Sequence, residues 1–285
     1  VLWLLANTYT FTATPPSGSN FATTTKSNIS ITSNTTEAIT MPQLVTLSGH
    51  VYDSQGNPVP NQQVSLKIPS ANFNQSTTTD SSGNYLLQVA PGDYFLDIFG
   101  QDNTGLVADV PQQYELTASY ALGQNTTADI VIPAYRVDTK TQDAFNDPVA
   151  NVGIGVVGST SSISFSVGGT MLSGSGRANY GQNGRVAPKT DSTGSTILWL
   201  MANNYTFTAN PPSGSNFVDT TVSNVSITGN AAETITMQQQ SVILSGHVYD
   251  VQGNPVPNQQ ISLKIPSANF NQSVITDSSG SYSLQ

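Results

Sequence analysis

The sequence predicts an all-β protein built from antiparallel β-sandwich modules arranged in tandem. Apolar and polar residues alternate in short runs, which is the pattern of strands with one buried face. Gly, Pro, Asn and Asp separate these runs and favour tight turns. The sequence also repeats along its 285 residues, and a fixed internal period is typical of a repeat architecture.

The internal repeat relates both ends of the sequence to its middle. Trp3 recurs as Trp199, an offset of 196, and after one inserted residue the offset becomes 197. A weaker similarity at an offset of 111 relates Asp80 to Asp191, each of which begins an Asp-Ser-x-Gly turn. One period therefore contains two related modules, here named module A and module B.

The repeat places the module boundaries. We expect module A at residues 44–133 and module B at residues 134–241. Residues 1–43 then correspond to the C-terminal half of a B module, and residues 242–285 to the N-terminal half of an A module. Both ends of the sequence fall inside an expected strand, so we interpret the 285 residues as a window on a longer array.

Alternating apolar residues place the expected strands. They lie at 45–51, 64–68, 85–89, 94–98 and 130–132 in module A, and at 152–156, 163–167, 198–200, 205–207, 225–227 and 235–237 in module B. A Gly- and Ser-rich stretch, roughly 168–188, is expected as an excursion from module B. We expect each module to bury its own core, and short linkers near Pro133 and at 238–240 to limit bending.

Composition excludes several classes of function. Only 9% of residues are charged, and the net charge is -9 with an isoelectric point near 4.3. An acidic chain repels nucleic-acid phosphates and anionic lipid, so neither is expected as a partner. The absence of Cys rules out disulfides and thiolate metal sites. No signal peptide or membrane span is recognised in this window.

No catalytic, cofactor-binding or metal-binding site is predicted. His50 and His247 are the only histidines, and they are one repeat position seen twice on the outward phase of a strand. Each turn with a nearby Gly offers one Asp, whereas calcium requires several converging carboxylates, so backbone capping is expected. Weak calcium binding between modules is the alternative. The aspartates concerned are Asp53, Asp80, Asp191, Asp250 and Asp277.

One strand of module B is apolar on both faces, unlike the others. It spans residues 197–201 with a copy at 1–5, and the two segments contain the only tryptophans, Trp199 and Trp3. An antiparallel strand with one face in water should alternate. Either a loop of the same module, such as 168–188, covers the outer face, or the two tryptophans bury against a neighbouring module or another chain. Trp3 and Trp199 are therefore the candidate inter-module contacts.

Asn-x-Ser/Thr sequons make seven asparagines candidates for glycosylation. They are Asn28, Asn34, Asn74, Asn125, Asn204, Asn224 and Asn271. A Lys–Asn cross-link is not expected, because Lys67 and Lys264 lie out of phase with the core and no acid is evident near them.

Four segments of module A carry a family resemblance. They are SGHVYD at 48–53, GNPVP at 56–60, TDSSGNY at 79–85 and APGDY at 90–94. With these motifs module A resembles the carboxypeptidase regulatory-like domain, and it is similar to the B-type repeats of collagen adhesins in microbial surface proteins. The resemblance implies a prealbumin-like or immunoglobulin-like sandwich. It extends to residues 242–285 as far as they go, whereas module B keeps only part of the pattern.

The sequence and this resemblance together predict a non-enzymatic extracellular or cell-surface protein, namely the repeat region of a filament, adhesin or stalk. Its expected partners are neighbouring modules or copies of itself. The alternatives are a carbohydrate- or host-protein-binding module, with Tyr52 and Phe95 as outward-phase aromatics, and an accessory region of a secreted enzyme. A further hypothesis is head-to-tail complementation, in which the two half modules complete each other between subunits.

Overall fold

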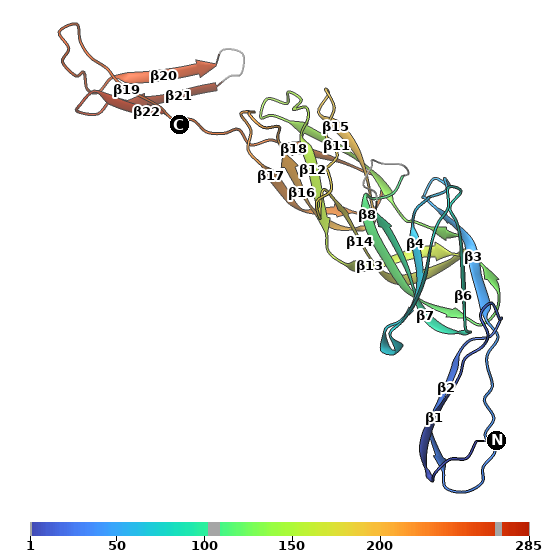
Figure 1. Cartoon of the computed structure of the whole chain (residues 1–285). Coiled ribbons are helices and arrows are strands. Elements are labelled where there is room, and N and C mark those ends of the chain that lie inside the picture. The colour runs from blue at the N-terminus through green and yellow to red at the C-terminus, as the bar shows by residue number, and fades with distance from the viewer. Residues whose placement is uncertain (1, 102–108, 266–269, 285) are drawn as a thin grey trace.

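The computed structural model of the chain describes residues 2–101, 109–265 and 270–284. Within these ranges the chain forms twenty-two strands and one short 3-10 helix, which confirms the predicted all-β fold class. Figure 1 shows an elongated molecule in which a central body is flanked by a smaller lobe at each end. Among the described residues, none forms a helix with the length and apolar character needed to cross a bilayer.

Module A is a sandwich of two sheets. Its elements are β3 (Val45–Tyr52), β4 (Gln63–Ile68), η1 (Pro69–Ala71), β5 (Phe73–Thr78), β6 (Asn84–Val89), β7 (Gly92–Gln101), β8 (Gln113–Leu122), β9 (Thr126–Thr127) and β10 (Ile130–Val131). One sheet joins β6 to β3, with β9 and β10 parallel to β3. The other has the order β5-β4-β7-β8. In β3 every second residue is buried, as period-two alternation requires.

Module B repeats this plan with one longer hairpin. Its strands are β11 (Tyr135–Gln142), β12 (Gly153–Gly158), β13 (Ser161–Val167), β14 (Thr170–Tyr180), β15 (Ser195–Leu200), β16 (Asn203–Asn210), β17 (Thr220–Ile227) and β18 (Ala231–Thr236). One sheet has the order β15-β11-β18, with β11 and β18 parallel. In the other, β12 lies between β14 and β16, and β17 pairs with β16.

The two end lobes are small and open. The N-terminal lobe contains β1 (Asn7–Ala13) and β2 (Thr24–Ile31), and the C-terminal lobe contains β19 (Leu244–His247), β20 (Gln260–Ile265), β21 (Phe270–Ile275) and β22 (Ser281–Leu284). Several apolar residues that are buried in modules A and B have exposed copies in these lobes, although Leu284 in β22 stays buried. Leu66 in β4 is 0% exposed, whereas its copy Leu263 in β20 is 40% exposed. The difference arises because β7 pairs with one edge of β4 and places neighbouring side chains there. Among the described strands, none pairs with the corresponding edge of β20.

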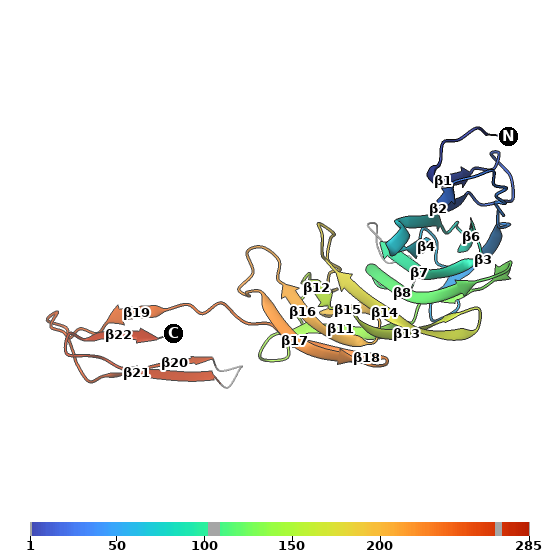
Figure 2. The same ribbon diagram turned by 90° about the horizontal axis from the view of Figure 1, so that it is seen from below.

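A single sheet of thirteen strands crosses the boundary between module A and module B. Strand β14 pairs with β8, and β13 pairs with β10, so the β13–β14 hairpin joins both sheets of module A (Figure 2). The expectation that residues 168–188 form an excursion is therefore wrong for residues 170–180, which are strand. The Gly, Ser and Ala residues of β14 have small side chains, which allow the backbone of β8 to come close. The hydrogen-bonded ladder between the two strands then satisfies backbone N–H and C=O groups of β14.

The buried apolar residues of both modules form one continuous cluster. It includes Leu47 and Leu116 of module A together with Phe165, Leu198 and Phe207 of module B, all of them fully buried. The expectation of a separate core for each module is therefore wrong. The β13–β14 hairpin brings apolar residues of module B against module A, and so merges the two cores.

Candidate functional site

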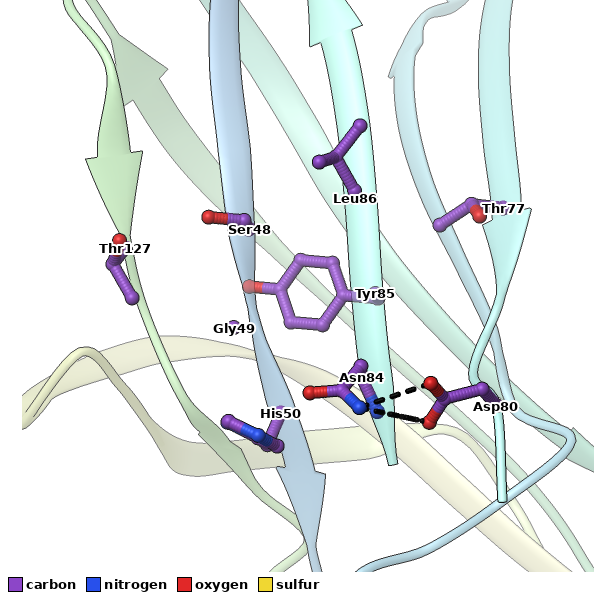
Figure 3. Close-up of a pocket in the computed structure, with 9 residues that line it drawn as sticks. All are labelled: Ser48, Gly49, His50, Thr77, Asp80, Asn84, Tyr85, Leu86 and Thr127. Atoms are coloured by element: carbon purple, nitrogen blue, oxygen red, sulfur yellow. Dashed lines mark hydrogen bonds between the residues drawn. The ribbon is translucent and has the colours of Figure 1, made fainter. Parts of the chain in front are cut away.

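A shallow groove lies on the outer face of β3 and β6, with a volume of about 460 Å³. Figure 3 shows its lining: Ser48, Gly49, His50, Thr77, Asp80, Asn84, Tyr85, Leu86 and Thr127. Tyr85 reaches past β3 and donates a hydrogen bond of 2.5 Å to the carbonyl oxygen of Ala128. This approach needs a glycine at Gly49, because a Cβ atom there would collide with the same carbonyl. The groove is thus shaped by the attachment of the last strands of module A to β3.

His50 is the one histidine of this groove, and its partner is a carboxylate. Its Nδ1 atom lies 3.1 Å from Oδ1 of Asp129, which also accepts a 2.9 Å hydrogen bond from the His50 backbone N–H. The imidazole stacks on Tyr52, and His247 stacks on Tyr249 in the same way. Across the described ranges, no group of three or more His, Cys, Asp or Glu side chains is placed to hold a metal ion. The pair therefore links β3 to the segment that carries β9 and β10.

The turn aspartates cap backbone N–H groups. In each turn one carboxylate oxygen accepts hydrogen bonds of 2.8 to 3.0 Å from the N–H groups two and four residues further on. The aspartates are Asp53, Asp80, Asp143, Asp191, Asp250 and Asp277; Asp143 was missed by sequence analysis, although it opens the same kind of turn. This geometry confirms the expected capping role.

These hydrogen bonds also stabilise the ionised carboxylates. They lower the pKa of Asp80, Asp191, Asp250 and Asp277 below the ordinary value of 3.8, and in each case the largest cause is a side-chain hydrogen bond. For Asp80 the donor is the Asn84 amide, which contacts both carboxylate oxygens (Figure 3).

Three of these aspartates directly follow a buried threonine, and each threonine connects two loops through hydrogen bonds. The Thr79 hydroxyl donates to the Val59 carbonyl and accepts from the Gln62 N–H, both at 2.8 Å. Thr190 makes the same two bonds in module B, and Thr276 makes them in the C-terminal lobe. The repeated Thr-Asp pair therefore joins the Asn/Asp-Pro-Val turn to the next turn in every copy.

A tyrosine hydroxyl closes a corner in three copies of one strand. Tyr9, Tyr94 and Tyr205 each donate to the carbonyl oxygen four residues earlier, at 2.7, 2.6 and 2.9 Å. Burial raises the pKa of Tyr94 and of Tyr205, so both hydroxyls remain protonated donors at neutral pH. Like the threonines, these repeated residues bind backbone groups of their own module.

A second groove, with a volume of about 610 Å³, crosses the outer face of β4, β7 and β8. Phe95 is 45% exposed in it, beside Tyr94, Tyr120 and Lys67. Lys67 forms an ion pair with the buried Asp97, which also accepts a 2.9 Å hydrogen bond from Thr117. Sequence analysis found no acid near Lys67, because Asp97 lies thirty residues away and reaches it only through strand pairing.

The two tryptophans lie in contrasting environments. Trp199 in β15 is only 9% exposed, whereas Trp3 in the N-terminal lobe is 93% exposed. The Tyr180 hydroxyl hydrogen-bonds to both the N–H and the C=O of Trp199, at 3.0 and 3.1 Å. It also lies 3.5 Å from the carbonyl oxygen of Val110 in module A. The Trp199 strand is therefore linked through Tyr180 to the boundary between the modules.

All seven sequon asparagines are exposed. Asn28 and Asn224 occupy equivalent positions with positive φ, where β2 and β17 shift register against their partners. Asn125 differs from the others because its side-chain oxygen accepts a hydrogen bond from the Thr46 N–H at 2.9 Å. Glycosylation at these positions stays a prediction.

The family model for the carboxypeptidase regulatory-like domain matches residues 46–131. The match falls within module A and runs from β3 to β10. The predicted resemblance is confirmed for this module. The matched residues include Asp53, Asp80, Thr79 and Tyr94, whose backbone hydrogen bonds are described above. A comparison with curated proteins found no match.

Several bacterial proteins of known structure, two pilins among them, show distant similarity. A shaft pilin from Lactobacillus rhamnosus GG is 10% identical, with 70% of this chain and 99% of that chain covered and a TM-score of 0.33. A minor pilin from Streptococcus agalactiae is 14% identical, with 70% and 97% covered and a TM-score of 0.34. The Bacillus anthracis TIE protein is 14% identical with a TM-score of 0.28, and this chain spans 43% of its length. Identity and TM-score are too low for these structures to bear on function.

Proposed function

We propose that this chain is a structural repeat region of an extracellular filament, adhesin or cell-surface stalk. The main support is the sheet of thirteen strands that continues from module A into module B. Such a sheet joins module A to module B without a flexible linker, so that repetition of the A–B pair lengthens the molecule. The expected partners are neighbouring modules or further copies of the chain.

The residues that recur between modules support this role. The turn aspartates, the buried threonines and the corner tyrosines all bind backbone groups within their own module. What the repeat preserves is therefore the shape of each sandwich. This pattern agrees with a non-catalytic protein.

The test uses chains with one, two and four copies of the period that begins at residue 44. The length of single particles, measured by electron microscopy, should increase by a constant amount with each added copy. Compact particles whose diameter rises slowly with mass would contradict the proposal.

The groove beside Phe95 favours carbohydrate binding as a second candidate function. The exposed Phe95 ring offers an apolar face on which a sugar ring could stack, with Lys67 nearby as a polar neighbour. Binding to immobilised glycans should be saturable and should disappear in a Phe95→Ala variant if this function is correct. Absence of saturable binding by the parent chain would leave the structural role alone.

A further inference from the structure

We propose that the β13–β14 hairpin of module B is a clasp that completes module A, so that the A–B pair is the cooperative and mechanical unit of the array. The clasp comprises residues Ser161–Tyr180, and its acceptor is the pair of edges that β8 and β10 offer. The inference concerns the joint itself. If the two modules prove to unfold independently, the joined sheet still supports the proposed structural role, so the cooperativity tested here can fail while that role stands.

The clasp binds both sheets of module A. Strand β14 pairs with β8 over six residues, Gly174–Asn179 opposite Gln113–Ala118. Strand β13 pairs with β10 in the other sheet, where Val167 lies opposite Ile130. At the hairpin turn the Gly168 N–H donates a 2.8 Å hydrogen bond to the Asp129 carbonyl. A hairpin held at two edges resists both sliding and opening, because either motion breaks a ladder.

Polar side chains secure the flanks of the clasp. Gln112 of module A accepts a 2.8 Å hydrogen bond from the Gly181 N–H and donates one of 2.9 Å to the Val186 carbonyl. Arg177 in β14 forms an ion pair with Glu115 in β8, with Nη2 2.9 Å from the carboxylate. These contacts attach Gly181, Val186 and Arg177 of module B to module A.

Glycines mark the positions where the two modules approach most closely. A Cβ atom on Gly174 would collide with the Thr117 carbonyl of module A and lie 2.9 Å from the Ala118 Cβ. A Cβ atom on Gly176 would lie 2.9 Å from Leu116 and 3.0 Å from Ile163. A side chain at Gly174 would push β14 away from β8, because its Cβ would meet the Thr117 backbone, whereas at Gly176 the Leu116 and Ile163 side chains would have to shift. The glycine content of this region is thus a requirement of the joint.

The clasp also contributes to the shared core. Ile163, Phe165 and Val167 of β13 are buried in the same cluster as Leu116 and Ile130 of module A. Loss of the clasp would expose apolar residues on both sides, so the two modules should gain stability from each other.

The opposite kind of joint, from module B to module A, occurs twice and lacks a clasp. It lies near residues 41–44 and 238–243. In the part of the chain that the structure describes, no strand pair crosses either joint, and the lobes beyond them form separate sheets. In an array, stiff joints from module A to module B would therefore alternate with flexible joints from module B to module A.

The test is hydrogen exchange measured by mass spectrometry on the full chain carrying Gly174→Val. In the parent chain, β3 and β6 of module A and β11 and β18 of module B should open together with similar protection. In the variant, β8 and β10 should lose protection first, and exchange in module A should become at least about tenfold faster relative to module B. The matched control is Ser175→Val, which adds the same side chain one residue further along, on the opposite face of β14. Equal protection in both modules of the Gly174→Val variant, or an equal effect of the control, would overturn the proposal.

A second measurement covers the case in which Gly174→Val prevents folding. The chain has no cysteine, so the pair Thr117→Cys and Ser175→Cys, which face each other across the joint, introduces a unique disulfide. Oxidation should link the two modules and raise protection in both. The within-hairpin pair Ser164→Cys and Ser173→Cys serves as the positive control for oxidation. A control pair that oxidises while the joint pair stays reduced would also overturn the proposal.

Discussion

At the scale of the residue, short polar side chains hold this protein's loops in place. The Thr190 hydroxyl is the clearest case, because it serves as donor and acceptor in one buried position. It donates to the Val149 carbonyl at 3.1 Å and accepts from the Val152 N–H at 3.0 Å. A buried group that loses such a partner keeps the cost of its desolvation.

Thr190→Val should therefore destabilise module B by about 2 kcal/mol. The valine keeps the shape of the threonine but leaves the Val152 N–H unpaired, while the Val149 carbonyl retains only its 2.6 Å hydrogen bond from the Thr141 hydroxyl. Urea unfolding followed by Trp199 fluorescence, in a Trp3→Phe background, measures the change. Thr190→Ser retains the hydroxyl and should recover most of the stability; a serine variant as unstable as the valine variant would contradict this explanation.

The capping aspartates predict a dependence of stability on pH. The pKa of Asp191 is lowered in the folded state, so its contribution is complete above the unfolded pKa of 3.8 and is lost as pH falls through the lower folded value. Asp191→Asn should reduce stability at neutral pH and weaken the further loss below about pH 4. Urea unfolding at a series of pH values tests this, and an unchanged acid profile would be evidence against it.

At the scale of the element, strand edges decide how the modules meet. Strand β15 is apolar on both faces because Leu198 and Leu200 lie in the core while Trp199 is also covered. The Tyr180 hydroxyl, which binds the Trp199 backbone, comes from the last residue of β14. Trp199 is thus a candidate for transmitting the position of the clasp to the second sheet of module B.

Trp199→Ser should loosen the joint while module B stays folded. We expect faster hydrogen exchange in β8 and β14, with little change in β11 and β18. Trp3→Ser is the matched control and should have no effect, because Trp3 is almost fully exposed. Equal loss of protection throughout module B would show that Trp199 serves only the core of its own module.

At the scale of the whole molecule, the two end lobes are the parts of the chain that should favour self-association. Strand β16 pairs with β12 on one edge, and its copy β1 has no equivalent partner among the described strands. Strand β20 likewise lacks the partner that β7 gives to β4. Unpaired edges beside exposed apolar residues favour association with another chain.

The 285-residue chain should therefore self-associate more strongly than residues 44–241. Sedimentation velocity at increasing concentration should show larger species for the full chain. If the half modules complete each other head to tail, a mixture of residues 1–241 and residues 44–285 should form a one-to-one complex. Two species that sediment independently in that mixture would argue against complementation.

The fold class, the repeat and the local turns follow from local patterns in the sequence. Alternation and turn residues depend on near neighbours, so they can be read without knowledge of the tertiary structure. The role of the buried threonines could not be read in this way, because their hydrogen-bond partners lie 17 to 41 residues away. No strand was expected at β8, although its alternation is present in the sequence: Tyr114, Leu116 and Ala118 alternate with polar residues, and all three are buried.

How the modules are joined depends on contacts between segments that are far apart in the sequence. Strand β14 is rich in Gly and Ser, and such residues indicate a loop until a neighbouring edge is known. The contact of Lys67 with Asp97 and the merging of the two cores also depend on segments far apart in the sequence. Long-range strand pairing has no local pattern, because it depends on which edges remain open once each sandwich has formed.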